Sequence, residues 1–317
     1  MLSRTAANLF WIGRYMERAE TVARLLEVGS RNALIPNIGG GYRNEWDAVL
    51  QAAGKVDAFR AKYGETVQRN IESFLFFDMD NPSSVASCVE AARENGRIVR
   101  TALTGQVWDA LNTGYQEMRE LRRTERSKLA LADLVDWTKR HSAMVRGAID
   151  DTLLRNDGYC FLYLGYALER GDSTARMVDV KYYVLLPEVS YVGSGIDNYQ
   201  WSTLLRSMSA ERSFNYAYGG EVTPGKIVDF LVLNREFPRA LITASEEAME
   251  HLDRLARGYG RTTPAQTQAR ALYGELCEMT VGDVFEEGLH EFLTRIINEN
   301  ASLSATINDV YLSGETR

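Results

Sequence analysis

The chain has 317 residues, of which 45% are hydrophobic and 25% are charged, values that are ordinary for a soluble globular protein. Its net charge of −7 argues against a nucleic-acid-binding protein, because such proteins usually carry a basic patch. No segment approaches the roughly 18 apolar residues of a membrane span, and charged residues interrupt the N-terminal apolar run, unlike in a signal peptide. We therefore expect neither nucleic acid nor a membrane among its partners.

Cysteine and histidine usage narrows the compartment and the chemistry. The three cysteines, Cys88, Cys160 and Cys277, lie far apart and form no CxxC pair. A sparse, odd number of cysteines fits a reducing compartment, so we expect a cytoplasmic protein. The three histidines show neither the HExxH nor the ExxH spacing of helical metal sites. The sequence therefore predicts no metal centre and no cofactor.

Helical periodicity dominates the chain from its first residues. Residues 5–28 are apolar on a broad face, with Ser3 or Thr5 available as the N-cap. Long helical patterns return at residues 127–154 and 281–312. Alternating strand patterns are scarce, and the 6 prolines leave most helices uninterrupted. We predict an all-α fold.

The sequence contains two copies of one pattern. Residues 10–28 read FWIGRYMERAETVARLLEV and residues 162–180 read LYLGYALERGDSTARMVDV, with 6 of 19 positions identical at an offset of 152. Average composition would give roughly one match. The alignment continues downstream with a drifting offset, as loop insertions into a duplicated unit produce. The sequence therefore predicts a pseudo-symmetric duplicated helical bundle, with one repeat in residues 1–150 and the second in residues 151–317.

Each copy also contains a proline after a second apolar run. The segment IESFLFFDMDNPSSV, which starts at Ile71, aligns with IVDFLVLNREFPRAL, which starts at Ile227. Their prolines, Pro82 and Pro238, coincide in this alignment. Proline is favoured in the first turn of a helix, where its missing N–H is not needed. We expect a helix to start at each of these prolines.

The strongest repeat carries charged residues at helical spacing. Gly13, Glu17, Glu20 and Arg24 fall within an arc of about 60° on one helix. The corresponding positions of the second copy are Gly165, Glu169, Asp172 and Arg176. Each stripe ends in a favourable i,i+4 ion pair, and the interpretations are a solvated salt-bridged face or a functional polar site. A mid-helix glycine costs roughly 1 kcal/mol, so its presence in both copies indicates that another backbone or a ligand approaches closely.

Arg18 and Arg170 lie about 100° away from these stripes, on a more apolar side of each helix. An unpaired buried charge is costly, so each arginine needs a carboxylate partner or an aromatic face. One interpretation is a structural ion pair between helices. The other is an arginine that holds a carboxylate or phosphate of a substrate or partner. Four carboxylates accompanied by arginines rather than histidine do not favour a di-metal site.

A second group of arginines occurs in the first copy. Arg93, Arg97 and Arg100 have i, i+4, i+7 spacing and precede Trp108 and Asn112. Such a stripe is a candidate contact for an anion or an acidic partner, although a solvated helix face gives the same pattern. The corresponding segment of the second copy has lost most of these arginines, which indicates that the two halves have specialised.

The motifs NLFWIGRYMERAETVARLLEV, LERGDSTARMVDV and DMDNPSSV together resemble the bacterial alpha-E domain family. The resemblance covers essentially the whole chain and implies a tandem helical domain with a Glu-Arg motif, carried here by Glu17–Arg18 and Glu169–Arg170. Its members are typically encoded beside circularly permuted ATP-grasp ligases, transglutaminase-like proteins and N-terminal-nucleophile peptidases. These neighbouring genes imply a peptide synthesis or modification system. The second copy departs from the family pattern, with Tyr166 in place of the arginine found at Arg14 and Gly171 in place of alanine.

Three functions follow as hypotheses. The first is a helical subunit that docks an ATP-grasp ligase and helps to present a peptide or amino acid, since the sequence contains neither a nucleophile–base constellation nor a nucleotide-binding loop. The second is a free-standing enzyme of amide chemistry, with Glu17 and Glu169 as acid and base and Arg18 and Arg170 orienting a carboxylate. The third is a purely structural interaction module. The sequence leaves open whether the chain forms a homo-oligomer.

Overall fold

The computed structural model describes residues 1–34, 45–183 and 195–313, and every regular element within these ranges is helical. The all-α prediction is therefore confirmed. The helices before residue 184 are α1 (Ser3–Asn32), α2 (Glu45–Ala52), α3 (Val56–Tyr63), α4 (Gln68–Glu72), α5 (Val85–Ile98), α6 (Gly105–Arg123), α7 (Leu131–Thr152) and α8 (Asp157–Tyr183). The later helices are α9 (Gly195–Ser207), α10 (Glu211–Tyr218), α11 (Pro224–Val228), α12 (Leu241–Tyr259), α13 (Pro264–Glu278), α14 (Val281–Glu287) and α15 (Leu289–Ile307).

The described residues also form short helical turns that are wound more tightly or more widely than an α-helix. They are the π-helical turns η1 (Ser73–Phe77), η5 (Asp229–Leu233) and η6 (Asn308–Leu312) and the 3₁₀ turns η2 (Arg100–Ala102) and η3 (Arg126–Lys128). None of the helices in the described ranges combines the length and the apolarity that a bilayer span requires.

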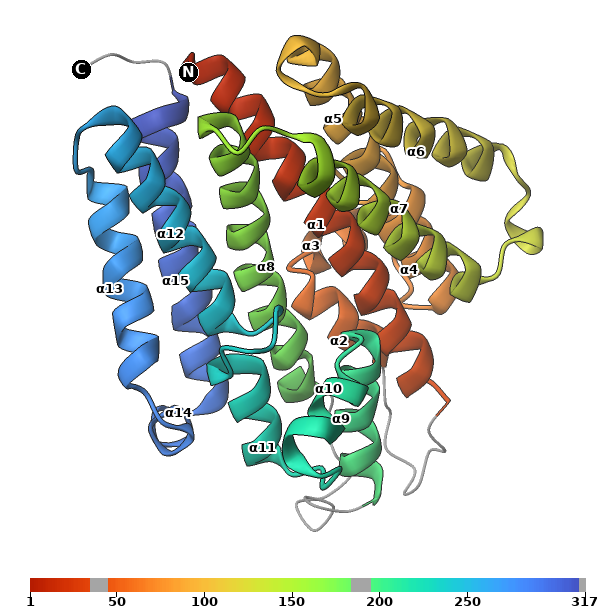
Figure 1. Cartoon of the computed structure of the whole chain (residues 1–317). Helices are drawn as coiled ribbons and strands as arrows, with labels where there is room; N and C mark the ends of the chain where they lie inside the picture. The colour runs from red at the N-terminus through yellow and green to blue at the C-terminus, as the bar shows by residue number, and fades with distance from the viewer. Residues whose placement is uncertain (35–44, 184–194, 314–317) are drawn as a thin grey trace.

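The two long helices α1 and α8 lie side by side at the centre of the molecule (Figure 1). Helices α5 and α7 pack on α1 and are joined by α6, whereas α12 and α15 pack on α8 and are joined by α13 and the short α14. The short helices α2 and α9 each contact both central helices. Because α1 and α8 are covered from several directions, most of the α1 surface is buried, including polar residues.

The hydrophobic core draws on both halves of the chain. One cluster combines residues such as Phe74 and Phe230, and the other combines residues such as Phe10 and Leu162. The two predicted repeats therefore do not form separate cores in the described part of the chain. The duplication itself and the boundary after residue 150 stay predictions from the sequence.

Helix starts differ from the sequence predictions where backbone or turn geometry replaces a side-chain cap. Helix α1 begins at Ser3, and neither Ser3 nor Thr5 caps it, because the N–H groups of Thr5 and Ala6 donate to the Leu2 carbonyl instead. The prediction that Pro82 starts a helix is wrong as well.

Both predicted prolines lie in turns, since α5 starts at Val85 and α12 at Leu241. The Asn81 side chain accepts a hydrogen bond from the Ser83 N–H and organises a turn through Pro82. Helix α5 therefore begins only after this turn, with Ser84 as its N-cap. Asn234 organises the turn before Pro238 in a related way. Prolines do open α11 and α13, each behind a capping threonine.

The predicted long helices near the ends of the two halves are shorter in the structure. The pattern at residues 127–154 is helical from Leu131 to Thr152. The pattern at residues 281–312 is broken at Gly288, whose φ of 95° lies outside the helical region and is readily adopted only by glycine. Apolar residues that become buried recur on both sides of this break, so the sequence pattern alone does not reveal it.

A buried histidine packs between α6 and α7. His141 is 3% exposed, stacks on Trp137 at 5.4 Å between ring centres, and occupies the space that a side chain at Gly114 would need. Neither ring nitrogen has a hydrogen-bond partner among the described residues. Burial lowers the pKa of His141 to about 4. His251 behaves similarly, since burial and the nearby Arg254 lower its pKa to about 4.

These histidines predict a loss of stability in mild acid. Their folded-state pKa values lie below the unfolded value of about 6.5, so the unfolded chain binds more protons as the pH falls through this window. For His141 alone, the unfolding free energy is expected to fall by about 3 kcal/mol between pH 6.5 and 4. Urea unfolding across this range measures the loss, and His141→Leu should flatten the curve. An unchanged slope in that variant would contradict the assignment.

Candidate functional site

The two Glu-Arg helices touch through their glycines. A Cβ atom on Gly13 would lie 2.2 Å from the Leu162 carbonyl oxygen, and one on Gly165 would lie 2.0 Å from the Phe10 carbonyl oxygen. Neither distance is sterically allowed, so only glycine lets the backbones of α1 and α8 approach this closely. The prediction of a close approach at both glycines is confirmed, and the approaching group is the backbone of the other helix.

The two Glu-Arg motifs exchange partners across this contact. Arg18 donates from Nε to Oε1 of Glu169 at 2.6 Å and from Nη2 to Oε2 at 2.9 Å. In return, Arg170 donates from Nη2 to Oε2 of Glu17 at 3.2 Å. Of the two partners that the sequence allowed for Arg18 and Arg170, a carboxylate or an aromatic face, the structure shows the carboxylates of the opposite motif. This exchange forms two reciprocal ion pairs between α1 and α8.

Glu17 lies at the centre of the larger of two charged clusters. Its side chain is 0% exposed, and besides Arg170 it receives Arg146 of α7 and Arg239 of the turn before α12. Arg146 donates to Oε2 and Arg239 to Oε1, both at 2.7 Å. Arg170 also reaches Glu247 of α12 at 3.4 Å. We use the name Glu17 centre for Glu17, Glu20, Arg24, Arg146, Arg170, Arg239 and Glu247.

Glu20 and Arg24 extend the Glu17 centre along α1. The predicted i,i+4 pair forms, with Arg24 Nη2 2.6 Å from Glu20 Oε1, and Arg239 donates to the same oxygen. Arg24 also donates to the Ser207 carbonyl and, at 3.1 Å, to the Ser209 hydroxyl. Ser209 has a φ of 57°, which is rare for a residue with a side chain. Arg24 thus ties α1 to the turn between α9 and α10.

A smaller Glu169 centre, consisting of Glu169, Arg14 and Arg18, lies on the other side of the contact. Arg14 Nε is 2.5 Å from Glu169 Oε2, in addition to the two bonds from Arg18. The predicted Asp172–Arg176 pair also forms, at 2.7 Å, and remains partly exposed. The stripe of α1 is therefore a buried interhelical network and not a solvated face, whereas the end of the α8 stripe keeps access to solvent.

The buried carboxylates of both centres are held in the ionised form. Burial alone would raise the pKa of Glu17, but its three arginines outweigh burial and hold the pKa well below its usual range. The pKa values of Glu20 and Glu169 are lowered in the same way, by arginines that overcome burial. A general acid or base works best with a pKa near the operating pH. These glutamates supply fixed negative charge and are poorly suited to proton transfer at neutral pH.

Three residues of the Glu17 centre were not predicted from the sequence. Arg239 follows Pro238 in a turn, where no periodic pattern marks it. Glu247 lies on α12, in the segment of the second copy that corresponds to the arginine-containing segment 93–100 of the first copy. Arg146 offered a signal in the sequence, because it lies in the periodic segment 127–154 directly after Val145, which belongs to the apolar face of α7. A charged residue next to such a buried stripe calls for a partner.

The second predicted cluster does not form a single stripe. Helix α5 ends at Ile98, so Arg100 lies in the η2 turn and not on the same helix as Arg93 and Arg97. The chain bends there because Val99 leaves helical geometry and Leu103 turns into the core. Arg93 and Arg97 both form ion pairs with Glu94. Arg93 and Arg100 both lie over the ring of Trp108. A role in anion or partner contact stays a prediction.

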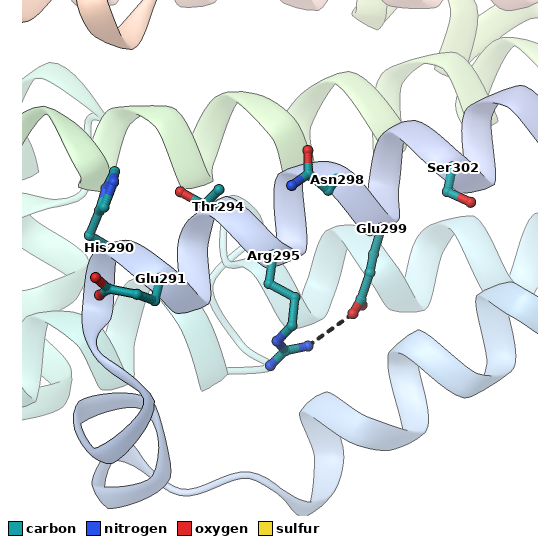
Figure 2. A pocket seen from close by; sticks show the side chains of 7 residues that line it. All are labelled: His290, Glu291, Thr294, Arg295, Asn298, Glu299 and Ser302. Carbon is teal, nitrogen blue, oxygen red and sulfur yellow. Dashed lines mark hydrogen bonds and ion pairs between the residues drawn. The ribbon is translucent and has the colours of Figure 1, made fainter.

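The described residues contain no group of three or more His, Cys, Asp or Glu side chains arranged to hold a metal ion. A surface pocket of about 670 Å³ lies elsewhere, along the outer face of α15 (Figure 2). Polar side chains of this one helix line it, and Arg295 pairs there with Glu299 at 3.0 Å. None of the predicted site residues lines this pocket, so it is separate from the Glu-Arg network.

Comparisons with known proteins agree with this architecture. A family model named Alpha-E, described as a predicted alpha-helical domain with a conserved ER motif, matches residues 1–312. Uncharacterized proteins of Mycobacterium bovis and of two strains of Mycobacterium tuberculosis are each 22% identical to the chain over 333 residues. The match covers 97% of this chain but only 36% of each relative, so the chain spans little more than a third of their length. No solved structure matches the chain significantly.

Proposed function

This chain belongs to the Alpha-E family, and on that premise we propose that it is a helical partner subunit of a peptide or amide-bond synthesis or modification system. In this proposal a circularly permuted ATP-grasp ligase makes the bond in the cytoplasm, and a transglutaminase-like protein belongs to the same system. The chain docks the ligase and helps to present a peptide or amino acid. The identity of these partners rests on the family resemblance.

The observation that carries the partner role is the length of the relatives. The matched region makes up 36% of each mycobacterial protein, so almost two thirds of each relative lies outside it. A helical domain that is joined to a much larger polypeptide in its relatives is suited to work beside another protein. In this proposal the chain takes the same place beside its ligase.

The state of the buried glutamates supports the partner role over a free-standing enzyme. Glu17 and Glu169 are the residues that such an enzyme would use as acid and base. Both are buried, paired with arginines and held with lowered pKa values. A purely structural module accounts equally well for the pairing, and it predicts that replacing the whole network by well-packed apolar residues preserves function.

Purification from the host and reconstitution test the proposed role. Tagged chain, isolated under native conditions and analysed by mass spectrometry, is expected to retain an ATP-grasp ligase in stoichiometric amount. The purified ligase should then turn over ATP and form product faster when the chain is added. A chain that purifies alone, together with a ligase product that is unchanged when the gene is deleted, would overturn the proposal.

A further inference from the structure

The Glu17 centre and the neighbouring Tyr166 contain buried polar groups that the described residues leave without hydrogen-bond partners. They are the hydroxyl of Tyr166 and the Nε atoms of Arg146 and Arg170. Tyr166 is 0% exposed, and Arg170 is 5% exposed. A buried hydroxyl or guanidinium N–H that bonds to nothing costs about 1–3 kcal/mol. Three such groups in one place leave donors to which a molecule from outside the chain can bind.

The three residues lie close to Glu17, whose charge and those of both arginines act on Tyr166. Arg146 and Arg170 both donate to Oε2 of Glu17, at 2.7 and 3.2 Å. The guanidinium carbon of Arg146 lies 5.0 Å from the ring centre of Tyr166. Tyr166 and Arg170 are one turn apart on α8, so their side chains leave the same face of that helix. A small ligand beside Glu17 would therefore meet two guanidinium groups and a phenol together.

The charges of the Glu17 centre favour an anion at this position. Its four guanidinium groups meet three carboxylates, so the described residues leave a surplus of one positive charge when Glu247 is ionised. Uncompensated charge is costly in a buried site. A carboxylate, with one negative charge, balances this surplus, whereas a phosphate carries about 1.5 to 2 negative charges at pH 7 and exceeds it.

The centre is accessible to solvent at Arg146 and Glu247. The side chain of Glu17 is 0% exposed and that of Arg170 is 7% exposed, but the side chains of Arg146 and Glu247 are 26% and 31% exposed. A ligand would enter between Arg146 on α7 and Glu247 on α12. Its polar end would lie against the buried groups, and the rest of the molecule would remain near the surface.

We propose that the Glu17 centre binds the carboxylate of an amino acid or of a peptide terminus, held by Arg146 and Arg170 and by a hydrogen bond from the Tyr166 hydroxyl. The forked guanidinium group matches the two oxygens of a carboxylate. This inference rests on the proposed function, for which it names the class of substrate that the subunit presents. It also gives a role to Tyr166, which stands where the first copy has Arg14.

Calorimetric titration of the isolated chain tests this site. The probes are N-acetylglycine, glycine and inorganic phosphate, each at matched ionic strength. We expect N-acetylglycine to bind and phosphate to bind more weakly. If glycine binds as tightly as N-acetylglycine, the ligands include free amino acids; if glycine does not bind, the ligands are peptide termini.

Tyr166→Phe should weaken carboxylate binding about tenfold, because it removes one hydrogen bond to a charged group. Without ligand, this variant should be no less stable, because the lost hydroxyl has no partner in the chain.

Matched variants separate binding from folding. Tyr163→Phe removes a hydroxyl that already donates to Asp150, so its carboxylate affinity should equal that of the unaltered chain. Arg146→Lys keeps the charge but loses the fork and should weaken binding, whereas Arg140→Lys on the exposed side of α7 should not.

Three results would overturn the assignment. The first is that the chain binds no carboxylate at millimolar concentrations. The others are that Tyr166→Phe and Arg146→Lys bind N-acetylglycine as tightly as the unaltered chain does, or that phosphate binds more tightly than N-acetylglycine. Because the titration needs only this chain, its outcome is independent of whether a ligase partner exists. A chain that binds carboxylates but has no ligase retains the site and loses the proposed function.

Discussion

Replacing Glu17 with glutamine is expected to lower the free energy of unfolding by roughly 3–5 kcal/mol, the loss typical of breaking a buried ion pair from one side. The change removes the charge that faces Arg146, Arg170 and Arg239 while leaving all three guanidinium groups in place. Their burial was offset by this carboxylate, and glutamine can accept hydrogen bonds without offsetting the charge. Urea unfolding at neutral pH, followed by circular dichroism, measures the difference.

An exposed glutamate provides the matched control. Glu120 is 71% exposed and pairs with Arg123 on the surface of α6. Glu120→Gln should change the unfolding free energy by less than about 0.5 kcal/mol. If Glu17→Gln is equally mild and yet abolishes function, Glu17 acts in catalysis or binding and not in holding the network together. A large loss of stability identifies it as a structural member of the network.

Replacing either glycine of the helix contact with alanine should be at least as damaging. A Cβ on Gly13 or Gly165 would overlap a carbonyl oxygen of the opposite backbone, at 2.2 and 2.0 Å. No rotamer change relieves a clash with backbone, so α1 and α8 must move apart and lengthen the ion pairs between them. We expect each variant to lose more than about 3 kcal/mol, the upper end of the usual range for overpacking, or to fail to fold.

Gly147 offers a control of the same chemistry. It lies on α7, and a Cβ there would meet nothing within 4 Å. Gly147→Ala should stabilise the protein by about 0.5–1 kcal/mol, because alanine favours the helix over the unfolded chain. Thermal melting of the three alanine variants compares them directly. Similar melting temperatures for Gly13→Ala and Gly147→Ala would contradict the prediction, because they would show that α1 and α8 move apart with little loss of stability.

The parts of the site that could be predicted from the sequence are those set by local helical geometry. The spacing of Glu20 and Arg24 predicts an ion pair, and that pair forms. The costly glycines at equivalent positions predicted a close approach, which the contact of α1 and α8 confirms. The sequence also predicted that Arg18 needs a carboxylate or an aromatic face, because an unpaired buried charge is unfavourable.

The identity of the distant partners could not be predicted, because tertiary packing decides it. Arg146 and Arg239 lie 129 and 222 residues from Glu17. No periodicity within one helix relates such positions, and Arg239 lies in a turn. The same reason explains the fold: helix class follows from local pattern, whereas the break at Gly288 depends on one backbone angle that the surrounding periodicity conceals.

The exchange of charges between α1 and α8 sets an order of events during synthesis. Glu17 leaves the ribosome long before the arginines that neutralise it, and Arg239 follows 222 residues later. At 5–20 residues per second this interval is roughly 10–45 s. Until then, the first helix carries acidic side chains that cannot enter an apolar core. The nascent first half therefore remains incompletely folded until the second half has emerged, and this interval is when it is most open to chaperones, to proteases or to a waiting partner.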